Sequence, residues 1–109
     1  MRAWASAFRL GGCPMGLVVE WDERKAELNI AKHGVTFREA ATVFADPLSS
    51  TIPDPLHSLG EQRLVTIGES SWMRALVVVH ADRGDRIRII SARFAARGER
   101  KRYEEGTQQ

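Results

Sequence analysis

The hydrophobic and polar positions of this chain change period from one segment to the next, and each period predicts an element. Residues 17–21 (LVVEW) form a short, mostly apolar run that is typical of a strand. Asp22 follows at the position of a helix N-cap, and the sequence predicts a helix from about residue 23 to residue 33. Gly34 comes directly after this segment, where glycine commonly ends a helix.

A second helix is predicted to begin after Thr36. Thr36 and Glu39 have the spacing of a capping box, in which the Thr36 side chain accepts from the Glu39 amide and the Glu39 carboxylate reaches back to the Thr36 amide. Asp46-Pro47 should end this helix, because proline lacks an amide proton and forces the residue before it out of the helical region. The apolar face of the helix would comprise Phe37, Ala40, Ala41 and Phe44.

The second half of the chain predicts a run of strands followed by one helix. Apolar and β-branched residues gather there in short segments separated by glycine, proline and aspartate. We expect strands at residues 48–52, 63–68, 75–80 and 86–91, and a last helix from about residue 95 to residue 105. The resulting order, β-α-α-β-β-β-β-α, predicts the α+β class, with a small twisted antiparallel sheet and helices packed on one side of it.

Length and composition indicate a single domain. The chain has 109 residues, of which 43% are hydrophobic and 28% are charged, and this is enough apolar material for one small core. We expect residues 17–105 to form the domain. Residues 1–16 are broken by several glycines and a proline and predict a poorly ordered N-terminal extension, while residues 106–109 predict a C-terminal tail.

Cysteine content and hydropathy bear on the compartment. Cys13 is the single cysteine, so no intramolecular disulfide can form and a reducing compartment is the simplest expectation. No segment has the apolar run of a secretory signal or the roughly 18 apolar residues of a membrane span. These features predict a cytoplasmic protein without a membrane partner.

Basic residues are concentrated between residues 83 and 103. This stretch carries eight of the sixteen Lys and Arg residues and a local net charge of +6, whereas the whole chain carries +2. Such an asymmetry indicates either a surface that meets phosphate or a solvated rim without a binding role. Arginine on an edge strand also opposes aggregation, and Lys101 and Glu105 have the spacing of a surface ion pair, so the residues alone leave both interpretations open.

The strand in this basic stretch should display its arginines on one face. Alternation places Arg86 and Arg88 on one side and Ile87 and Ile89 on the other. Arg93 has the opposite parity, so it shares a surface with the first two arginines only if the strand ends or bulges before it. Arginine suits a phosphate clamp because its guanidinium meets two phosphate oxygens at once and stays charged at any working pH.

Eight short motifs follow one another over about residues 18–105, namely EWDERK, KHGVTF, VFADPLS, PDP, RLVTIG, LVVVH, RGDRIRIISAR and ER-x-x-Y. Their order and spacing resemble the BrnT family of toxins from bacterial type II toxin–antitoxin pairs. The resemblance implies a RelE-like fold and a ribonuclease that arrests translation. It also implies a BrnA-like antitoxin with a ribbon-helix-helix domain, a heterotetramer of two toxins and two antitoxins, and contact with operator DNA only through the antitoxin.

The residues that would carry this activity can be nominated from chemistry. Cleavage of RNA through its own 2′-hydroxyl needs a proton acceptor, a cationic clamp for the phosphate and a donor for the leaving oxygen. The nominated catalytic set is Lys32, Glu69, Arg74, His80 and Arg93, and the nominated RNA-binding set is Arg86, Arg88 and Arg97. Histidine titrates near working pH, which favours an acid or base role for His80, but a hydrogen-bonded structural histidine fits equally well. Glu69 would be the base, with an exposed turn residue as the alternative.

No metal or other cofactor is expected. The three histidines lack the short spacings of a metal site, and no glycine-rich phosphate loop follows a strand. The leading hypothesis is therefore a metal-independent endoribonuclease, and the alternative is a non-catalytic nucleic-acid-binding or interaction module. Trp72, next to Met73 in a predicted hairpin, could stack on a base or be an ordinary exposed turn residue.

Overall fold

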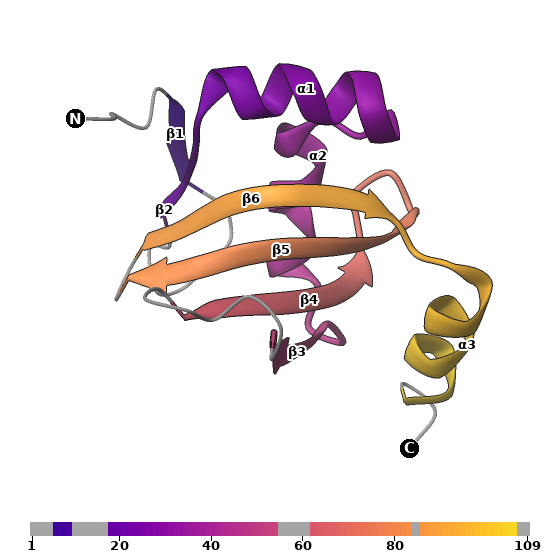
Figure 1. The fold of residues 1–109 in the computed structure, drawn as a ribbon. Helices are drawn as coiled ribbons and strands as arrows, with labels where there is room; N and C mark the ends of the chain where they lie inside the picture. Colours follow the sequence, from indigo (N-terminus) through magenta and orange to yellow (C-terminus); the bar gives the residue numbers. More distant parts are fainter. Residues whose placement is uncertain (1–5, 10–17, 55–61, 84–85, 107–109) are drawn as a thin grey trace.

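A computed structural model describes residues 6–9, 18–54, 62–83 and 86–106 of the chain. Strands and helices alternate along it much as the sequence predicts (Figure 1). The elements are β1 (Ser6–Arg9), β2 (Val18–Trp21), α1 (Glu23–His33), α2 (Phe37–Thr42), the short 3-10 helix η1 (Val43–Ala45), β3 (Ser50–Pro53), β4 (Arg63–Glu69), β5 (Ala75–Arg83), β6 (Arg86–Phe94) and α3 (Arg97–Gly106).

The strands form one six-stranded sheet in the order β1-β2-β6-β5-β4-β3. Strands β3 to β6 pair antiparallel with their sequence neighbours, whereas β2 runs parallel to β6, with Val19 opposite Ile87. The predicted α+β class is confirmed, but the sheet is mixed and not antiparallel throughout. The difference arises because β2 pairs with a strand that lies more than sixty residues later in the chain, and the pattern of a single strand does not specify so distant a partner.

Strand β1 lies within the segment for which we predicted a poorly ordered extension. Residues 6–9 pair antiparallel with β2, with Ser6 opposite Trp21 and Arg9 opposite Val18. This pairing covers the edge of β2 that β6 leaves open, and it satisfies backbone groups that would otherwise face solvent. The rest of that segment, like residues 107–109 of the expected C-terminal tail, falls outside the described residues, so the domain boundaries stay a prediction.

Helices α1 and α2 cover one face of the sheet, and α3 extends from the end of β6 beyond the sheet (Figure 1). The core lies between the sheet and the first two helices. Its fully buried side chains include Val19, Phe37, Leu76, Val78 and Ile89. Each such side chain contributes about 1.5–3 kcal/mol when it is removed from water, so this layer supplies most of the hydrophobic free energy of folding. No helix within the described ranges is long and apolar enough to cross a membrane.

The helix ends follow the predicted capping, with one exception. Asp22 accepts from the Arg24 amide at 2.9 Å, and Gly34 ends α1 with a φ of 72°. The Thr36 hydroxyl accepts from the Glu39 amide at 3.1 Å, as expected. The reciprocal bond from the Glu39 carboxylate to the Thr36 amide was a wrong prediction, because that carboxylate points into the protein and binds Arg74 instead.

Helix α3 begins at a residue that is not a usual N-cap in sequence. Its first backbone hydrogen bond runs from the Arg100 amide to the Ala96 carbonyl, and Ala96 has no side-chain oxygen with which to cap. The Glu99 carboxylate reaches back instead and accepts from the Ala96 amide at 2.8 Å. This is the half of a capping box that a glutamate three residues into the helix can supply alone.

Strand β6 contains a bulge at Ile90. Val79 of β5 stands opposite Ser91, and the next residue, His80, stands opposite Ile89, so Ile90 has no partner in the register. The bulge shifts the alternation by one residue. Arg93 consequently lies on the same face of the sheet as Arg86. The sequence predicted a shared surface only if the strand ended or bulged before Arg93, and the bulge meets this condition.

Candidate nucleic-acid interface

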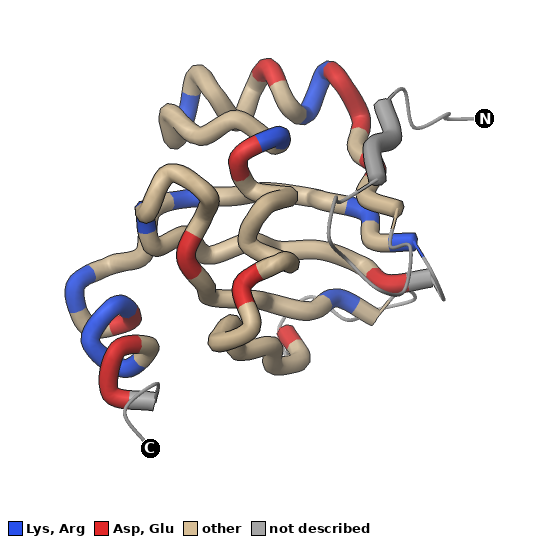
Figure 2. Tube along the Cα trace, turned by 180° about the vertical axis from the view of Figure 1, so that it is seen from behind, with Lys and Arg blue, Asp and Glu red and all other residues tan. Residues whose placement is uncertain are grey.

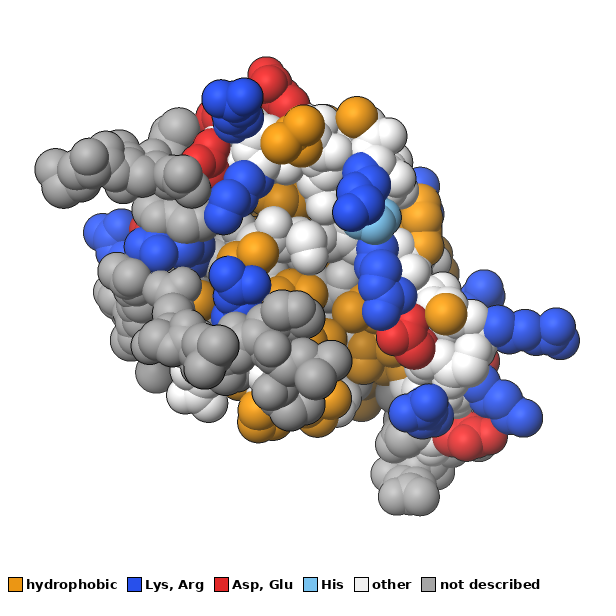
Figure 3. Space-filling view, in the orientation of Figure 1, with side chains coloured by type: hydrophobic (Ala, Val, Ile, Leu, Met, Phe, Trp, Pro, Cys, Tyr) orange, Lys and Arg blue, Asp and Glu red, His pale blue; other side chains and the backbone are white. Residues whose placement is uncertain are grey.

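The face of the sheet that α1 and α2 leave uncovered has an apolar floor. Val65, Ile67 and Val77 lie in register across β4 and β5 on this open face. Figure 3 shows apolar side chains exposed here, with Lys and Arg side chains on both sides of them. Between this floor and α3 lies a hollow of about 290 Å³, to which Arg102 and Tyr103 contribute. A shallow apolar surface bordered by cations is suited to a nucleic acid strand.

Arg86 and Arg88, both nominated for RNA binding, share one carboxylate. Arg86 donates to Glu20 at 2.9 Å, and the Arg88 Nε lies 3.7 Å from the other oxygen of Glu20. Glu20 is buried, whereas the Arg86 side chain is 57% exposed and the Arg88 side chain 15%. The predicted alternation is present, since Ile87 and Ile89 are buried. Arg86 therefore presents an exposed guanidinium to solvent beside the buried carboxylate that it binds.

Arg93 is held by a carboxylate of α3. Its two terminal nitrogens donate to the two oxygens of Glu99, each at 2.8 Å. These bonds are the main reason why the pKa of Glu99 falls to about 2, and the bond from the Ala96 amide lowers it further. The pair attaches α3 to the end of β6. A phosphate that binds Arg93 has to compete with Glu99 for the same guanidinium.

Charged positions of both signs are interleaved closely along α3, whereas on the strands of the sheet they are spread further apart (Figure 2). Arg97 opens the helix and is exposed. Arg100 pairs loosely with Glu104 at 3.4 Å, and both side chains are more than half exposed. Exposed pairs of this kind contribute little to stability, so Arg100 can exchange its partner for a phosphate at small cost.

A second hollow, the hairpin hollow, lies where the β4–β5 turn, the end of β6 and α3 meet. Its volume is about 310 Å³. It brings together two of the nominated catalytic residues, Glu69 and Arg74, with two residues of α3 that sequence reasoning did not nominate, Arg100 and Tyr103. The signal for these two was present in the ER-x-x-Y motif, because residues three apart on a helix face the same way.

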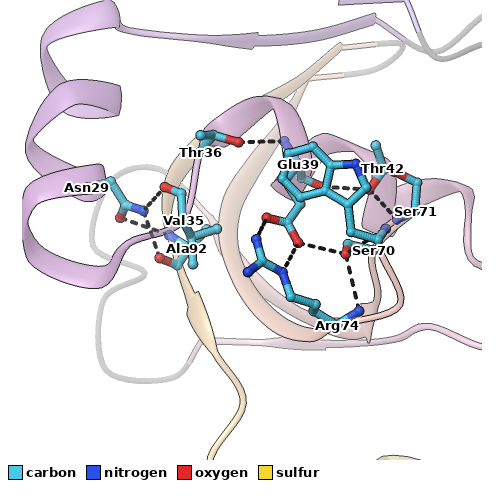
Figure 4. A network of polar contacts seen from close by, with 10 residues as sticks. Asn29, Val35, Thr36, Glu39, Thr42, Ser70, Ser71, Arg74 and Ala92 are labelled. Carbon is cyan, nitrogen blue, oxygen red and sulfur yellow. Dashed lines mark hydrogen bonds and ion pairs between the residues drawn. The ribbon is translucent and has the colours of Figure 1, made fainter.

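Arg74 is fixed at this site by a buried acid. Its Nε donates to the Glu39 carboxylate at 2.8 Å, and a terminal nitrogen donates to the other carboxylate oxygen (Figure 4). The Ser70 hydroxyl donates to the same carboxylate at 2.8 Å. Burial alone raises the pKa of Glu39, but the bonds from Arg74 and Ser70 outweigh it and hold that pKa below its ordinary value. The guanidinium thus has a set position and orientation.

A second acid network underlies the hairpin hollow. The Tyr103 hydroxyl donates to Asp46 Oδ2 at 2.5 Å, and the Glu69 amide donates to the same oxygen at 2.8 Å. Burial, the bond to Asp46 and the nearby charges of Asp46 and Glu69 all raise the pKa of Tyr103, so its phenol stays protonated at any working pH. The network holds α3 against the end of β4 and leaves the exposed Glu69 side chain at the rim of the hollow.

His80 lies in the core, on the face of β5 that packs under the helices. It is 2% exposed, and its Nε2 and Nδ1 lie 2.7 Å from Thr66 Oγ1 and Asp82 Oδ1. Its ring meets Phe44 edge to face, with 4.8 Å between centroids. Burial lowers the pKa of His80, against the opposing effect of Asp82. These contacts are those of a structural histidine without access to a surface substrate.

Lys32 stands apart from both hollows. It lies exposed in the last turn of α1 and is not among the residues that line the hollow between the apolar floor and α3 or the hairpin hollow. The structure therefore brings Glu69 and Arg74 together, places Arg93 at the neighbouring end of β6, and separates Lys32 and His80 from them. Within the described part of the chain, no group of three or more His, Cys, Asp or Glu side chains is arranged to hold a metal ion.

Comparison with known proteins identifies the family. The model of the family described as "Ribonuclease toxin, BrnT, of type II toxin-antitoxin system" matches residues 21–99. Among solved structures, the chain is similar to the Brucella abortus ribonuclease toxin BrnT, with 29% sequence identity and a TM-score of 0.55 over 71% of this chain and 94% of that chain. No curated protein matches the chain. Because the family model spans most of its length, the chain belongs to the BrnT family of ribonuclease toxins of type II toxin–antitoxin systems.

Proposed function

We propose that this chain cleaves RNA at the hairpin hollow and thereby arrests translation. The observation that carries the proposal is the convergence of an exposed carboxylate, Glu69, with two guanidinium groups, Arg74 and Arg100, around one hollow of a BrnT-family fold. Carboxylate and guanidinium groups supply two of the three functions that cleavage through the 2′-hydroxyl requires. The sequence nominated Glu69 and Arg74 independently of this geometry.

In the proposed reaction Glu69 accepts the proton of the 2′-hydroxyl, whose oxygen attacks the neighbouring phosphorus. The bond from phosphorus to the 5′-oxygen breaks, the 5′-oxygen takes a proton from water, and a 2′,3′-cyclic phosphate remains. Arg100, whose partner Glu104 is exposed, binds the phosphate and stabilises the negative charge that grows on its oxygens. Arg74 keeps its carboxylate partner, so it acts as a fixed dipole at the edge of the hollow that orients the strand. These steps use side chains and water, and we propose that the cleavage is independent of metal.

Glu69→Gln should lower the rate of RNA cleavage by about 10²- to 10⁴-fold, which is the usual contribution of a general base. The measurement is cleavage of total RNA, alone and with ribosomes, by the purified chain freed of any antitoxin, in the presence and absence of a chelator. Glu27→Gln is the matched control, because Glu27 is exposed on α1. Cleavage that Glu69→Gln does not slow would remove Glu69 from the site, and RNA that stays intact in every arm would contradict the ribonuclease proposal. Cleavage lost with the chelator would contradict metal independence.

Replacing both Arg86 and Arg88 with alanine should flatten the salt dependence of RNA affinity. For single strands, log affinity falls with log salt by about 0.7 for each phosphate contacted, so the loss of one or two contacts lowers the slope by about that amount each. The double substitution Arg24→Ala/Arg38→Ala, at exposed positions of α1 and α2, is the control. An unchanged slope in the first variant, with its circular dichroism intact, would show that these arginines are rim charges.

We also propose that the toxin is cytoplasmic and is neutralised by a BrnA-like antitoxin with a ribbon-helix-helix domain. Membership of a type II toxin–antitoxin family supports an antitoxin partner. The cationic border of the open face would favour an acidic, partly apolar antitoxin segment, and dimerisation of the antitoxin would bring two toxins into a heterotetramer. Operator DNA would then be bound through the antitoxin. Co-expression with the neighbouring reading frame followed by light scattering measures the mass of the complex, and a heterodimer of one toxin and one antitoxin would contradict the heterotetramer.

A further inference from the structure

Three large apolar side chains stand exposed at the end of the molecule where the β4–β5 turn meets the end of β6. Trp72 is 59% exposed, Met73 79% and Phe94 43%. The Arg74 guanidinium lies over both aromatic rings, 5.4 Å from the centroid of the Trp72 ring and 5.0 Å from that of Phe94. Single exposed apolar side chains are common on protein surfaces, but several that lie together mark a binding site.

The backbone of the turn holds this cluster in place. The Ser70 amide donates to the Arg74 carbonyl at 2.9 Å, and the Ser71 amide donates to the Thr42 hydroxyl of α2 at 2.9 Å. Met73 adopts a φ of 62°, a left-handed conformation that is unfavourable for a side chain of its kind. The surrounding bonds maintain this conformation, and strain of this sort is found most often at functional sites.

The charge of Arg74, at the centre of the cluster, is already paired with a buried carboxylate. Its hydrogen bonds to Glu39 neutralise it and fix its plane (Figure 4). A fixed guanidinium covers one face of the Trp72 ring, and because Trp72 is 59% exposed, the rest of that ring meets solvent. The result is a group of two rings and a charge-paired guanidinium beside the hairpin hollow.

We propose that Trp72, Arg74 and Phe94 form a platform on which a base of single-stranded RNA stacks, next to the scissile phosphate bound in the hairpin hollow. The inference rests on the proposed function and adds to it a base-binding site. A nucleobase is a flat, polarisable group that stacks on aromatic rings and on guanidinium planes alike. A phosphate attached to that base would reach Arg100, which lines the same hollow as Arg74 and Phe94.

The position of the platform at the end of β6 favours a nucleic acid strand as its occupant. Phe94 ends β6 opposite Leu76, on the side of the sheet that the helices cover, whereas Arg93 before it and Arg86 at the other end of the strand share the open face, roughly 20 Å apart at about 3.3 Å per residue. A strand of RNA laid along the open face of β6 would meet cations at both ends, and it would reach the platform where it passes the end of β6 at the hairpin hollow, which Arg74 and Phe94 line. A protein segment would find apolar surface here too, and binding of an oligonucleotide to Trp72 variants separates the two occupants.

The test measures binding without cleavage. The probe is a labelled 2′-O-methyl oligonucleotide of roughly 10 nucleotides, a length within the usual range of site sizes, and it lacks the free hydroxyl through which cleavage would run. A companion series lacks one base at a time. We expect one abasic position to weaken binding to the unaltered protein about 5- to 150-fold, which corresponds to the stacking of one base at about 1–3 kcal/mol.

Trp72→Ala should weaken binding of the intact oligonucleotide by a similar factor. The affinity of this variant should be the same for the intact oligonucleotide and for the one that lacks the stacked base. Trp72→Phe should retain most of the affinity, because it keeps a ring. Leu28→Ala, at an α1 position that is 62% exposed, is the matched control and should bind as the unaltered protein does. Circular dichroism checks that each variant is folded.

The other outcomes overturn the inference in distinguishable ways. If the oligonucleotide binds but neither Trp72→Ala nor any abasic position changes its affinity, the platform is refuted and RNA binding stands. If the unaltered protein binds no oligonucleotide, RNA binding by this surface is refuted together with the platform. If Trp72→Ala keeps its RNA affinity but loses the complex with the protein encoded by the neighbouring reading frame, the cluster is a protein contact.

Discussion

Replacing Arg74 with methionine should reverse the contribution that Glu39 makes to the dependence of stability on pH. In the unaltered protein the pKa of Glu39 lies below its ordinary value of 4.5. Its contribution to stability is thus present above the pKa of the unfolded chain and is lost as the pH falls through the lower folded-state pKa. Without Arg74, burial dominates and raises the folded-state pKa above 4.5. The carboxylate then destabilises the fold at neutral pH.

The expected result is a stability difference between the two proteins that is largest near pH 7 and shrinks as the pH falls toward 4.5. Over the range between the unfolded and the raised folded-state pKa, Glu39 changes this difference with a limiting slope of about 1.4 kcal/mol per pH unit, the value for one proton. Urea denaturation of both proteins across this range gives the measurement. Taking the difference removes the effects of other acids, such as Glu99, that titrate in both proteins.

Arg100→Met is the control for this experiment, because it removes an arginine whose carboxylate partner, Glu104, is exposed. Its stability difference from the unaltered protein should be small and independent of pH. A difference for Arg74→Met that stays flat from pH 4.5 to 7 would show that Ser70 and solvent suffice to keep the Glu39 carboxylate charged.

Asn29→Ala should destabilise the protein by about 3 kcal/mol or more. Asn29 is 6% exposed, and its amide donates to the carbonyls of Val35 at 3.0 Å and of Ala92 at 2.8 Å, while its oxygen accepts from the Ala92 amide at 3.1 Å (Figure 4). Alanine would leave three buried backbone groups without partners, each at a cost of about 1–3 kcal/mol. The side chain joins α1, the loop before α2 and the edge of β6, so no single neighbour can replace it.

Thermal and urea unfolding of this variant, compared with Leu28→Ala at the adjacent exposed position, provide the measurement. Leu28→Ala should change the free energy of unfolding by no more than about 0.5 kcal/mol, as is usual for surface substitutions. A loss below about 1 kcal/mol for Asn29→Ala would mean that water enters and satisfies the three groups.

Features fixed by neighbours in sequence could be predicted from the sequence. The caps of α1 and α2 depend on Asp22, Gly34 and Thr36 and on backbone amides or carbonyls no more than four residues away, so the pattern contains all the partners. Features fixed by distant partners could not be predicted. The Glu39 carboxylate fits a capping box by spacing, but it binds an arginine 35 residues later, because burial makes a charged partner worth more than a local amide.

The candidate site shows the same division. Glu69 and Arg74 flank one turn, so the sequence could place them near each other. Arg100 and Tyr103 reach the same hollow from α3, and nothing within the helix indicates which end of the sheet it meets. The carboxylates that accompany the cations were missed for the same reason, since Glu20 lies on a strand that pairs with β6 only after the whole fold has formed.

The bulge at Ile90 has a consequence for changes of length in β6. Without Ile90, the segment from Arg86 to Arg93 would alternate regularly, with arginine or serine on the open face and isoleucine or alanine toward the core. Deletion of Ile90 therefore leaves all the remaining side chains of the strand on their present faces. Deletion of Ile87 or Ala92 instead turns one end of the strand over, which would bury an arginine or expose the core. Among related chains, a one-residue gap in this strand is expected at the bulge.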